Sequence, residues 1–431
     1  MKTVYKIFIT AAVILTPGMA NRPKAQTVLT LDKCVETALA NNALTKSAAN
    51  NLGMAQESQK SAGTRYFPTI SASATGFIAD KGLAKIDMAP GASMSMMKDG
   101  IVGGILASQP VFAGGQIVNA NKLAKVNVER YRLTSRQAEN EVRLTTEQYF
   151  WQIVVLKEKQ NTIAAVEAQL EQLDRDVTAA VKAGVTNRND LLQIRLKRND
   201  MASSRLTVAN ELALSKRLLA QYMGMDINDS IDVAYNTAND SMPESPASLY
   251  RHPDEALIST PEYGLLQAGT TAAKIERKMA TGKLLPTVAI GGGYMYDNLT
   301  DRDKPAWIGF ATVSVPLSDW WGGSHDIKRQ KMAESNAEIQ QDNQSQLLKI
   351  KMQAAWDALN KAYRQIDIAC SSIRQSSENL RLNQDYYKAG TTTMSELLDA
   401  QTLFRQSRDS YVEARAEYEI KKCEYMIATG Q

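Results

Sequence analysis

Residues able to perform catalysis or to bind metals are few and scattered in this sequence of 431 residues. The two histidines, His252 and His325, have no HExxH motif and no cysteine near them, so zinc chemistry has little support. The three cysteines, Cys34, Cys370 and Cys423, have no CxxC spacing, and an odd number cannot form a closed disulfide framework within one chain. Buried or inert thiols are expected.

The glycine-rich segments also lack the residues of a nucleotide site. Paired or triple glycines stand at 103–104, 114–115, 291–293 and 322–323. None is followed by the Lys-Ser/Thr of a phosphate-binding loop, and the sequence contains no GxSxG motif. We therefore expect no catalytic site, no cofactor and no metal.

The first 25 residues have the pattern of a secretory signal peptide. Lys2 and Lys6 flank the start of an apolar run over 7–15, and small residues follow it. Cleavage after Ala20 and cleavage after Ala25 both fit the pattern. The alternative is a buried N-terminal helix.

Removal of this segment changes the charge balance. The formal net charge of the whole sequence is +4, and four cations lie in the first 25 residues, namely Lys2, Lys6, Arg22 and Lys24. The mature chain is thus close to neutral, so its charge gives no reason to expect nucleic acid as a partner. Beyond the signal segment no window reaches the roughly 18 to 20 apolar residues of a transmembrane helix, whereas the weaker pattern of a β-barrel is not excluded.

The rest of the sequence contains one plan twice. Lys182-Ala183-Gly184 precedes a segment that ends at Gly224, and Lys388-Ala389-Gly390 precedes one that ends at Gly430, at equal spacing. A Pro-Thr pair also begins a strand-like stretch in each half, at 68–69 and 286–287. We expect a first repeat over 26–225, a polar linker over 226–253 and a second repeat over 254–431. Each repeat reads helix, strand, loop, strand, very long helix, turn and helix.

The strand-like stretches alternate apolar and polar residues. The stretch 69–79 has one apolar and one mostly polar side, and 288–296 and 307–315 continue the theme. Aromatic residues stand near the strand ends: Tyr294, Tyr296, Trp307, Trp320 and Trp321. Such a pattern fits either a soluble hairpin or a membrane barrel with an aromatic girdle. Four strands cannot close a barrel of about eight strands, so a membrane-spanning form requires several copies of the chain.

The long helices have the strongest pattern. Apolar residues recur every seven positions: Val142, Tyr149, Leu156, Ile163, Leu170 and Val177; Met352, Leu359, Ile366, Ile373, Leu380 and Tyr387; Leu397, Phe404, Tyr411, Tyr418 and Tyr425. A sustained repeat of seven predicts left-handed supercoiling, and these stripes are interpreted as core. The segments 115–184 and 323–390 would each span about 100 Å as helix. Two helices of about 35 residues, end to end, would line each long one.

This ordered set resembles the TolC-type outer-membrane factor family, the exit ducts of efflux pumps and type I secretion systems. The resemblance rests on the two Pro-Thr strand starts, on residues 109–112 before a double glycine, and on the two Lys-Ala-Gly turns. It implies a mainly α fold with a small β part, in which a homotrimer forms a twelve-stranded outer-membrane barrel and a helical periplasmic tunnel. It also implies a periplasmic adaptor and an inner-membrane pump as partners, besides outer-membrane lipid.

The family's periplasmic gate maps onto residues near the two turns. Tyr387 resembles the gate tyrosine, Asp190 the acidic residue it reaches, and Glu396 and Asp399 the acidic rings that face the pore. The family's gate arginine falls on Thr392, which removes one ion-pair partner. Alternative roles remain open. Tyr387 also lies on the heptad stripe and can be a core residue. Asp190 and Glu396 also stand where a helix begins, and a carboxylate in the first turn of a helix stabilises it by about 0.3 to 1 kcal/mol.

The two turns themselves are expected to contact the adaptor. This interpretation assigns Lys182, Gly184, Lys388 and Gly390 to the adaptor contact. At the other end, the Met-rich insertion over 80–100 is interpreted as a flexible surface loop, with a lid over the outer mouth as the alternative.

The function expected from the sequence is passive conduction of substrates from a pump, through the periplasm, to the outside, by a protein that is not an enzyme. Drug, metal and protein cargo remain open, because the pump chooses the cargo. The rival is a soluble periplasmic coiled-coil scaffold or adaptor, which predicts polar residues on both faces of the strands.

Overall fold

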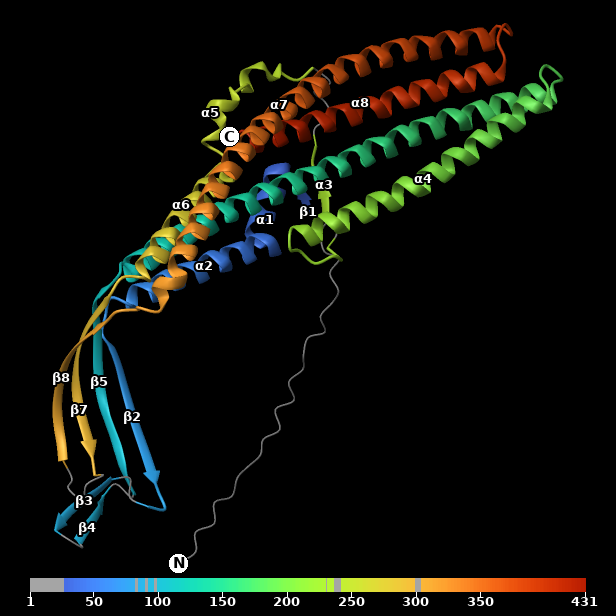
Figure 1. Ribbon diagram of the computed structural model, residues 1–431. Coiled ribbons are helices and arrows are strands. Elements are labelled where there is room, and N and C mark those ends of the chain that lie inside the picture. Colours follow the sequence, from blue (N-terminus) through green and yellow to red (C-terminus); the bar gives the residue numbers. More distant parts are fainter. Residues whose placement is uncertain are drawn as a thin grey trace, which may run out of the picture.

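The computed structural model describes residues 27–81, 84–89, 92–96, 99–229, 231–235, 242–298 and 304–431, and of the segments 84–89 and 92–96 it describes the backbone alone. The expected signal peptide, 1–25, lies outside the described residues. The chain forms a long helical body with a β-sheet at one end (Figure 1).

Four long helices form most of the body: α3 (Gln116–Lys182), α4 (Arg188–Tyr222), α7 (Asp319–Lys388) and α8 (Met394–Ala428). Helices α3 and α7 contain 67 and 70 residues, and α4 and α8 contain 35 each. At 1.5 Å per residue the two longest helices each span about 100 Å, as the sequence predicts. The turns that end α3 and α7 lie together at the end of the body remote from the sheet (Figure 1).

The shorter helical stretches are broken, which the sequence interpretation did not foresee. They form α1 (Leu31–Asn41) and α2 (Ala43–Thr64) in the first half, and α5 (Pro253–Leu257) and α6 (Pro261–Gly282) in the second. Asn42 interrupts the first stretch because its side chain caps α2. The side-chain oxygen accepts from the Leu44 backbone N–H at 2.7 Å, and the side-chain nitrogen donates to the Tyr222 carbonyl at 2.8 Å. Thr260 caps α6, and Pro261 at the first helical position fixes the new start.

The main sheet is antiparallel and joins the two halves of the chain. Its order is β2-β5-β7-β8, formed by β2 (Thr69–Ile78), β5 (Asp99–Ala113), β7 (Thr287–Asp297) and β8 (Lys304–Ser314). Pairing of β5 with β7 connects the halves, with an irregularity between Pro110 and Phe112 where proline lacks an N–H. The sheet of one chain is open, with β2 and β8 as its edges.

Two small strand pairs complete the fold. β3 (Ala84–Ala89) and β4 (Ala92–Met96) form a hairpin within the segment interpreted as a flexible loop. β1 (Thr27–Leu29) pairs in parallel with β6 (Ile231–Val233), and the 3-10 helix η1 (Pro246–Leu249) follows before α5.

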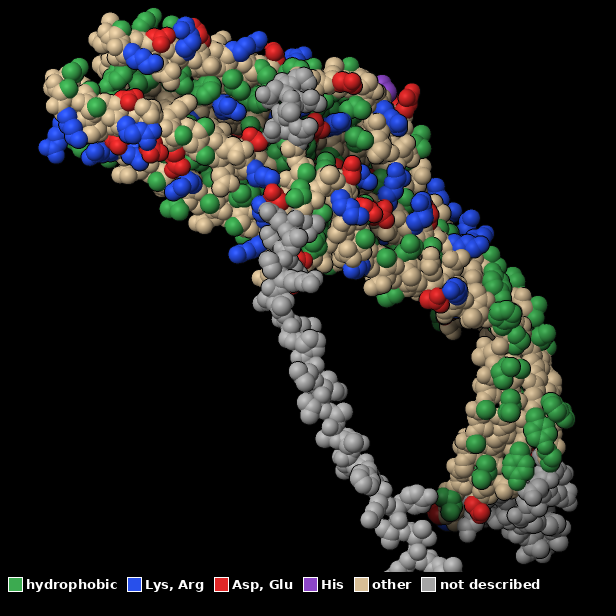
Figure 2. Space-filling model, turned by 180° about the vertical axis from the view of Figure 1, so that it is seen from behind, with side chains coloured by type: hydrophobic (Ala, Val, Ile, Leu, Met, Phe, Trp, Pro, Cys, Tyr) green, Lys and Arg blue, Asp and Glu red, His purple; other side chains and the backbone are tan. Residues whose placement is uncertain are grey.

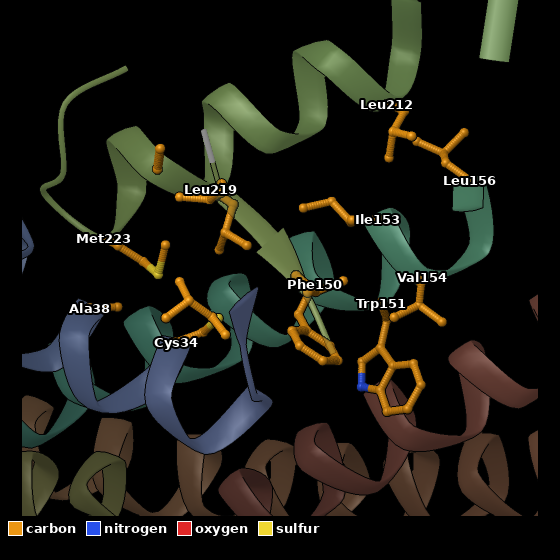
Figure 3. Packing of buried hydrophobic residues seen from close by; sticks show 14 of the residues in the cluster. Cys34, Ala38, Phe150, Trp151, Ile153, Val154, Leu156, Leu212, Leu219 and Met223 are labelled. Carbon is orange, nitrogen blue, oxygen red and sulfur yellow. The ribbon is translucent and has the colours of Figure 1, made fainter. Parts of the chain in front are cut away.

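The heptad stripes form the core, as expected. Val142, Ile163 and Leu170 of α3 are buried, and one cluster fills the space between α1, α3 and α4. Figure 3 shows Cys34 and Ala38 of α1 facing Leu219 of α4 and Met223 directly after α4, with the side chains of α3 alongside.

The linker is fastened along the helices by polar contacts. Asp232 of β6 pairs with Lys157 of α3 at 3.0 Å and with Lys216 of α4 at 2.9 Å. Farther on, the Tyr418 hydroxyl donates to the Glu244 carbonyl at 3.1 Å. The linker therefore packs against the helical body at several points.

The charged residues are unevenly distributed. Lys, Arg, Asp and Glu cover the helical body, whereas hydrophobic side chains gather on the sheet (Figure 2). In the part of the chain that the structure describes, no helix combines the length and the apolar character needed to cross a membrane.

Candidate functional site

One face of the sheet is almost wholly apolar. Because directly paired residues lie on the same face, the strand register assigns to this apolar face the following residues: Ile70, Ala72, Ala74, Gly76 and Ile78; Ile101, Gly103, Ile105 and Ala107; Val288, Ile290, Gly292, Tyr294 and Tyr296; Pro305, Trp307, Gly309, Ala311 and Val313. Gln109 and the terminal Asp99 are its polar members. Its large side chains are exposed, with Ile78 at 85% and Trp307 at 82%.

The opposite face has a different composition. It mixes polar and apolar residues: Ser71, Ser73 and Thr75 of β2 lie there together with Leu106, Met295, Ile308 and Phe310, and β7 contributes Gly291 and Gly293. A Cβ added to Gly293 would approach the Ile105 carbonyl oxygen to 2.1 Å, so the close approach of β5 requires glycine at this position. The sheet therefore has an apolar face and a mixed face, each of which is exposed in a single chain.

The aromatic residues predicted at the strand ends divide into two groups. Tyr294 and Trp307 are direct cross-strand partners on the apolar face, with ring centroids 5.3 Å apart in an edge arrangement. Tyr296 follows on the same face, opposite Pro305. These residues lie toward the end of the sheet remote from the helices.

Trp320 and Trp321 belong to the first turn of α7 instead of to a strand. The Trp320 indole N–H donates to the Leu284 carbonyl at 2.9 Å, which ties the start of α7 to the chain after α6. Trp321 is 84% exposed. Aromatic side chains thus stand near both ends of the sheet, the second group at its junction with the helices.

The two Lys-Ala-Gly turns have the same backbone geometry. Helices α3 and α7 end at Lys182 and Lys388, and the glycines that follow, Gly184 and Gly390, have φ of 75° and 74°. In each turn the residue after the glycine donates its N–H back to the carbonyl of the third-last helical residue, Val185 to Ala180 and Thr391 to Tyr386, both at 2.9 Å. The two helix ends are therefore closed in the same way. Lys182, Gly184, Lys388 and Gly390 are all exposed at the tip of the body.

The first turn holds Asp190 in a hydrogen-bonded network. Asn187 caps α4 by accepting from the Asp190 N–H at 3.0 Å, and the Thr186 hydroxyl donates to Asp190 Oδ2 at 2.6 Å. Tyr387 of α7 hydrogen-bonds to Thr186. The Thr186 hydroxyl thus lies between the Tyr387 phenol and the Asp190 carboxylate. We call Tyr387, Thr186 and Asp190 the turn network.

The structure therefore brings together the two residues that the sequence paired, through a third that it missed. Burial raises the pKa of the Tyr387 phenol, and the nearby negative charge of Asp190 raises it further. Tyr387 also packs against a buried cluster that contains Leu170 and Leu397. It is thus a core residue that also belongs to a polar network.

The second turn repeats this arrangement with one change. Thr392 donates to Glu396 Oε2, as Thr186 does to Asp190, but Thr393 replaces asparagine as the cap. The Thr393 backbone N–H donates to the same oxygen at 2.9 Å, and the Glu396 N–H donates back to the Thr393 hydroxyl at 3.3 Å, forming a capping box. These hydrogen bonds from Thr392 and Thr393 hold the pKa of Glu396 below its usual value.

Glu396 is accordingly a helix cap in this chain, and Asp399 lies one turn farther along α8. Both side chains are exposed. The sequence shows the signal for the cap as Thr-x-x-Glu over 393–396. Both turns also contain a threonine four residues before an acidic residue, which is the sequence signal for the hydrogen bonds from Thr186 and Thr392.

The outermost helices of the body, α4 and α7, expose apolar stripes. Leu192, Leu196, Leu206, Leu214 and Leu218 of α4 are exposed, as are Met332, Ile339, Ile350, Ile368 and Tyr386 of α7. Within the chain α4 packs mainly on α3, and α7 on α8 and α6. The members of each stripe lie on one side of their helix at helical spacing, with polar residues between them.

No metal centre is formed by the described residues: they contain no group of three or more His, Cys, Asp or Glu able to hold an ion. The three cysteines are free; Cys34 and Cys423 are buried and Cys370 is half-buried. Burial raises the pKa of the Cys34 thiol to about 12, so it stays protonated at neutral pH.

Residues 253–430 match the family model described as outer membrane efflux protein. Among curated protein sequences, none matches this chain.

Solved structures with a similar fold cover almost the whole chain. The CmeC outer membrane channel of Campylobacter jejuni is similar with a TM-score of 0.78 and 17% identity, over 93% of this chain and 85% of that chain. The outer membrane protein VceC of Vibrio cholerae has a TM-score of 0.79 and 14% identity, over 93% of this chain and 96% of that chain. The open state of the MtrE outer membrane channel of Neisseria gonorrhoeae has a TM-score of 0.76 and 16% identity, over 93% of this chain and 88% of that chain.

These findings confirm the resemblance deduced from the sequence. Residues 253–430 carry an outer membrane efflux protein domain, and the chain as a whole has the fold of outer membrane channels. Members of that family are channels of the outer membrane and not enzymes.

Proposed function

We propose that this protein is the outer-membrane exit duct of a tripartite efflux or type I secretion system, which passively conducts substrates from an inner-membrane pump across the periplasm and outer membrane. The observation that carries the proposal is the exposed apolar face of the sheet. Strands β2, β7 and β8 contain 10, 11 and 11 residues, which is the length of about 9 to 11 residues that a tilted strand needs to span a bilayer.

The open edges of the sheet support assembly into a trimer. Unpaired N–H and C=O groups cannot face lipid, so β2 and β8 require partners. In the order β2-β5-β7-β8 the edge strands run antiparallel to each other. Strand β8 of one copy can therefore pair with β2 of the next and continue the alternation around a ring.

The number of copies follows from the need for a lumen. Two copies would give eight strands, and side chains fill the interior of a barrel of about that size. Three copies give twelve strands and are the smallest ring that leaves a wider passage. The exposed stripes of α4 and α7 would then meet between neighbouring copies and close the helical tunnel along its length.

The turn end is proposed as the periplasmic gate and as the contact with the adaptor. The turn network joins α7 to the turn before α4, so it connects the two helical hairpins of one chain. Opening the tunnel requires these hairpins to separate, which would break the network. Asp399 and the Oε1 atom of Glu396 would line a constriction that attracts cations. The turns at Lys182, Gly184, Lys388 and Gly390 would contact the adaptor.

A soluble periplasmic scaffold is less consistent with the structure, because it predicts polar residues on both faces of the sheet. Two measurements distinguish the proposals. Outer-membrane fractionation followed by an unheated gel should show a heat-sensitive trimer, whereas a scaffold would be released by osmotic shock. The purified protein should also form pores in planar bilayers.

The gate proposal has its own test, which uses the turn network. Thr186→Val removes the hydroxyl that connects Tyr387 to Asp190 and should raise the open probability in planar bilayers. Thr207→Val is the matched control, because the Thr207 hydroxyl donates only within its own helix α4, to the Ser203 carbonyl at 3.2 Å. Equal conductance of both variants and the parent protein would reject the network as the gate.

The acidic constriction is tested separately. Glu396→Ala combined with Asp399→Ala should lower the cation preference and weaken block by multivalent cations. Unchanged selectivity would show that these carboxylates do not face the pore.

A further inference from the structure

A cavity of about 660 Å³ lies on the helical body, against α3, α7 and α8, and is separate from the sheet and the turns. This volume is within the range of about 300 to 1,000 Å³ that is typical of sites for small organic molecules. Tyr235 and Met242, the described residues on either side of 236–241, form part of one wall. None of the functions proposed above uses this cavity.

The inner part of the cavity is apolar and aromatic. Trp151 and Val154 of α3 belong both to the cavity wall and to the buried cluster, and Figure 3 shows them extending from the same side of α3. Trp151 meets Tyr235 edge to face, with ring centroids 5.0 Å apart. Phe404 and Tyr411 of α8 add two more rings. The wall is therefore well suited to a flat apolar body.

Charged residues also line the cavity. Among the described residues these are three arginines and two carboxylates, namely Arg374, Arg408, Arg415, Glu158 and Asp367. Among the described residues, Arg408 has no ion-pair partner, and Arg374 donates to the neutral hydroxyl of Ser371 at 3.2 Å. Two guanidinium groups are thus available to an anion from outside the cavity wall.

We propose that this cavity binds an organic anion, a flat apolar or aromatic body with one carboxylate or sulfonate. The aromatic wall takes the body, and the guanidinium groups of Arg374 and Arg408 take the anionic group. A planar guanidinium donates two parallel hydrogen bonds to a carboxylate, which favours an anion over a neutral molecule of the same shape.

The experiment compares two probes of one shape. Isothermal titration of the purified full-length protein in nonionic detergent measures binding of 1-naphthoate and of the neutral 1-naphthalenemethanol, with titrations into detergent alone subtracted. Loss of a charge-assisted hydrogen bond typically weakens binding about tenfold or more, so naphthoate should bind at least about tenfold tighter than the alcohol.

Variants then assign the effect to the cavity. Arg408→Gln should reduce the affinity for naphthoate about tenfold and leave the affinity for the alcohol unchanged. Arg364→Gln is the control, because Arg364 is exposed on α7, the helix that carries Arg374, but lies outside the cavity. Trp151→Ala should weaken both probes, and thermal melting checks that each variant is folded.

Three results would overturn the proposal. These are equal affinity for the acid and the alcohol, an equal loss in the Arg364→Gln control, and the absence of saturable binding of naphthoate. Because pore formation is not measured, none of these results bears on the proposed duct.

Discussion

The lipid contact of the sheet can be tested with two adjacent residues of β2. Ala74 lies on the apolar face, midway between Ile70 and Ile78, and Ser73 lies on the mixed face. Their cross-strand partners are both glycines, Gly103 and Gly104. Arginine at either position therefore meets no partner side chain on the neighbouring strand, and the two variants differ chiefly in the face that receives the charge.

The expected magnitude follows from the depth of Ala74. The apolar face between Ile70 and Ile78 spans about 26 Å along the strand at 3.3 Å per residue, and at a strand tilt of about 40° this corresponds to about 20 Å across the membrane, most of the height of about 25 Å of the apolar band of outer-membrane barrels. Ala74 is thus near the bilayer midplane, where arginine on the lipid face costs about 2 to 4 kcal/mol. Each 1.4 kcal/mol is a factor of ten, so Ala74→Arg should lower the folding equilibrium in lipid roughly 30- to 1,000-fold per chain.

The assay is folding into lipid vesicles, followed by urea titration of the heat-sensitive form on unheated gels. Ala74→Arg should shift the midpoint strongly to lower urea, and Ser73→Arg should shift it little because its side chain faces the interior. Abundance in the outer membrane should fall in the same order. Equal losses in the two variants, or a larger loss in Ser73→Arg, would refute the assignment of the apolar face to lipid.

Two further predictions concern stability. Gly390→Ala should destabilise the chain by about 1 to 2 kcal/mol in thermal melting, because Gly390 has a φ of 74°, although an added Cβ would meet no atom. Gly269→Ala is the control, because Gly269 lies in the interior of α6 and an added Cβ would also meet no atom. This substitution should stabilise the chain by about 0.5 to 1 kcal/mol. For Asp232, burial opposes ionisation, but the ion pairs with Lys216 and Lys157 outweigh it and lower the pKa of the carboxyl. The stabilisation from ionised Asp232 is present above the pKa of this carboxyl in the unfolded chain and is lost as pH falls through its pKa in the folded chain. The difference in melting temperature between the parent protein and Asp232→Asn should therefore shrink on acidification. A difference that stays constant with pH would contradict this link between the ion pairs and stability.

The parts of the fold that the sequence predicted are those set by local spacing. The heptad stripes of α3, α7 and α8 and the two turns depend on residues close to one another in the chain, as Gly184 and Gly390 illustrate. The repeat therefore revealed the long helices and both turn ends directly. It also placed Tyr387 and Asp190 at the same end, since both turns lie at equal distances from the strands.

The features that were missed depend on contacts between distant segments or on single caps. Parallel pairing of β1 with β6 joins segments about half a chain apart, and a run of three residues carries no periodic signal. The break before α2 depends on Asn42, whose side chain caps one helix and bonds to the end of another. Trp320 lies near the end of β8, as expected, but in the first turn of α7, because aromatic character alone does not distinguish a strand end from the first turn of a helix.

Thr186 of the turn network also depends on a contact between distant segments, so its spacing in the sequence does not predict its role. A hydroxyl group serves caps, backbone bonds and side-chain bonds equally, so its partner is fixed only by the approach of α7 to the first turn. The repeat gave a clue in Thr392, which bonds to Glu396 in the corresponding place.

The second turn allows capping and pore charge to be separated at a single residue. The hydrogen bonds to the Glu396 carboxylate described above all end on Oε2, so Oε1 is left to face outward. Glutamine serves at this position of a capping box as glutamate does. Glu396→Gln should therefore keep the melting temperature while it lowers cation preference in planar bilayers, whereas Glu396→Ala should lower both, because it also loses the reciprocal half of the box. If Glu396→Gln leaves the selectivity unchanged, the residue is a helix cap and no part of the pore.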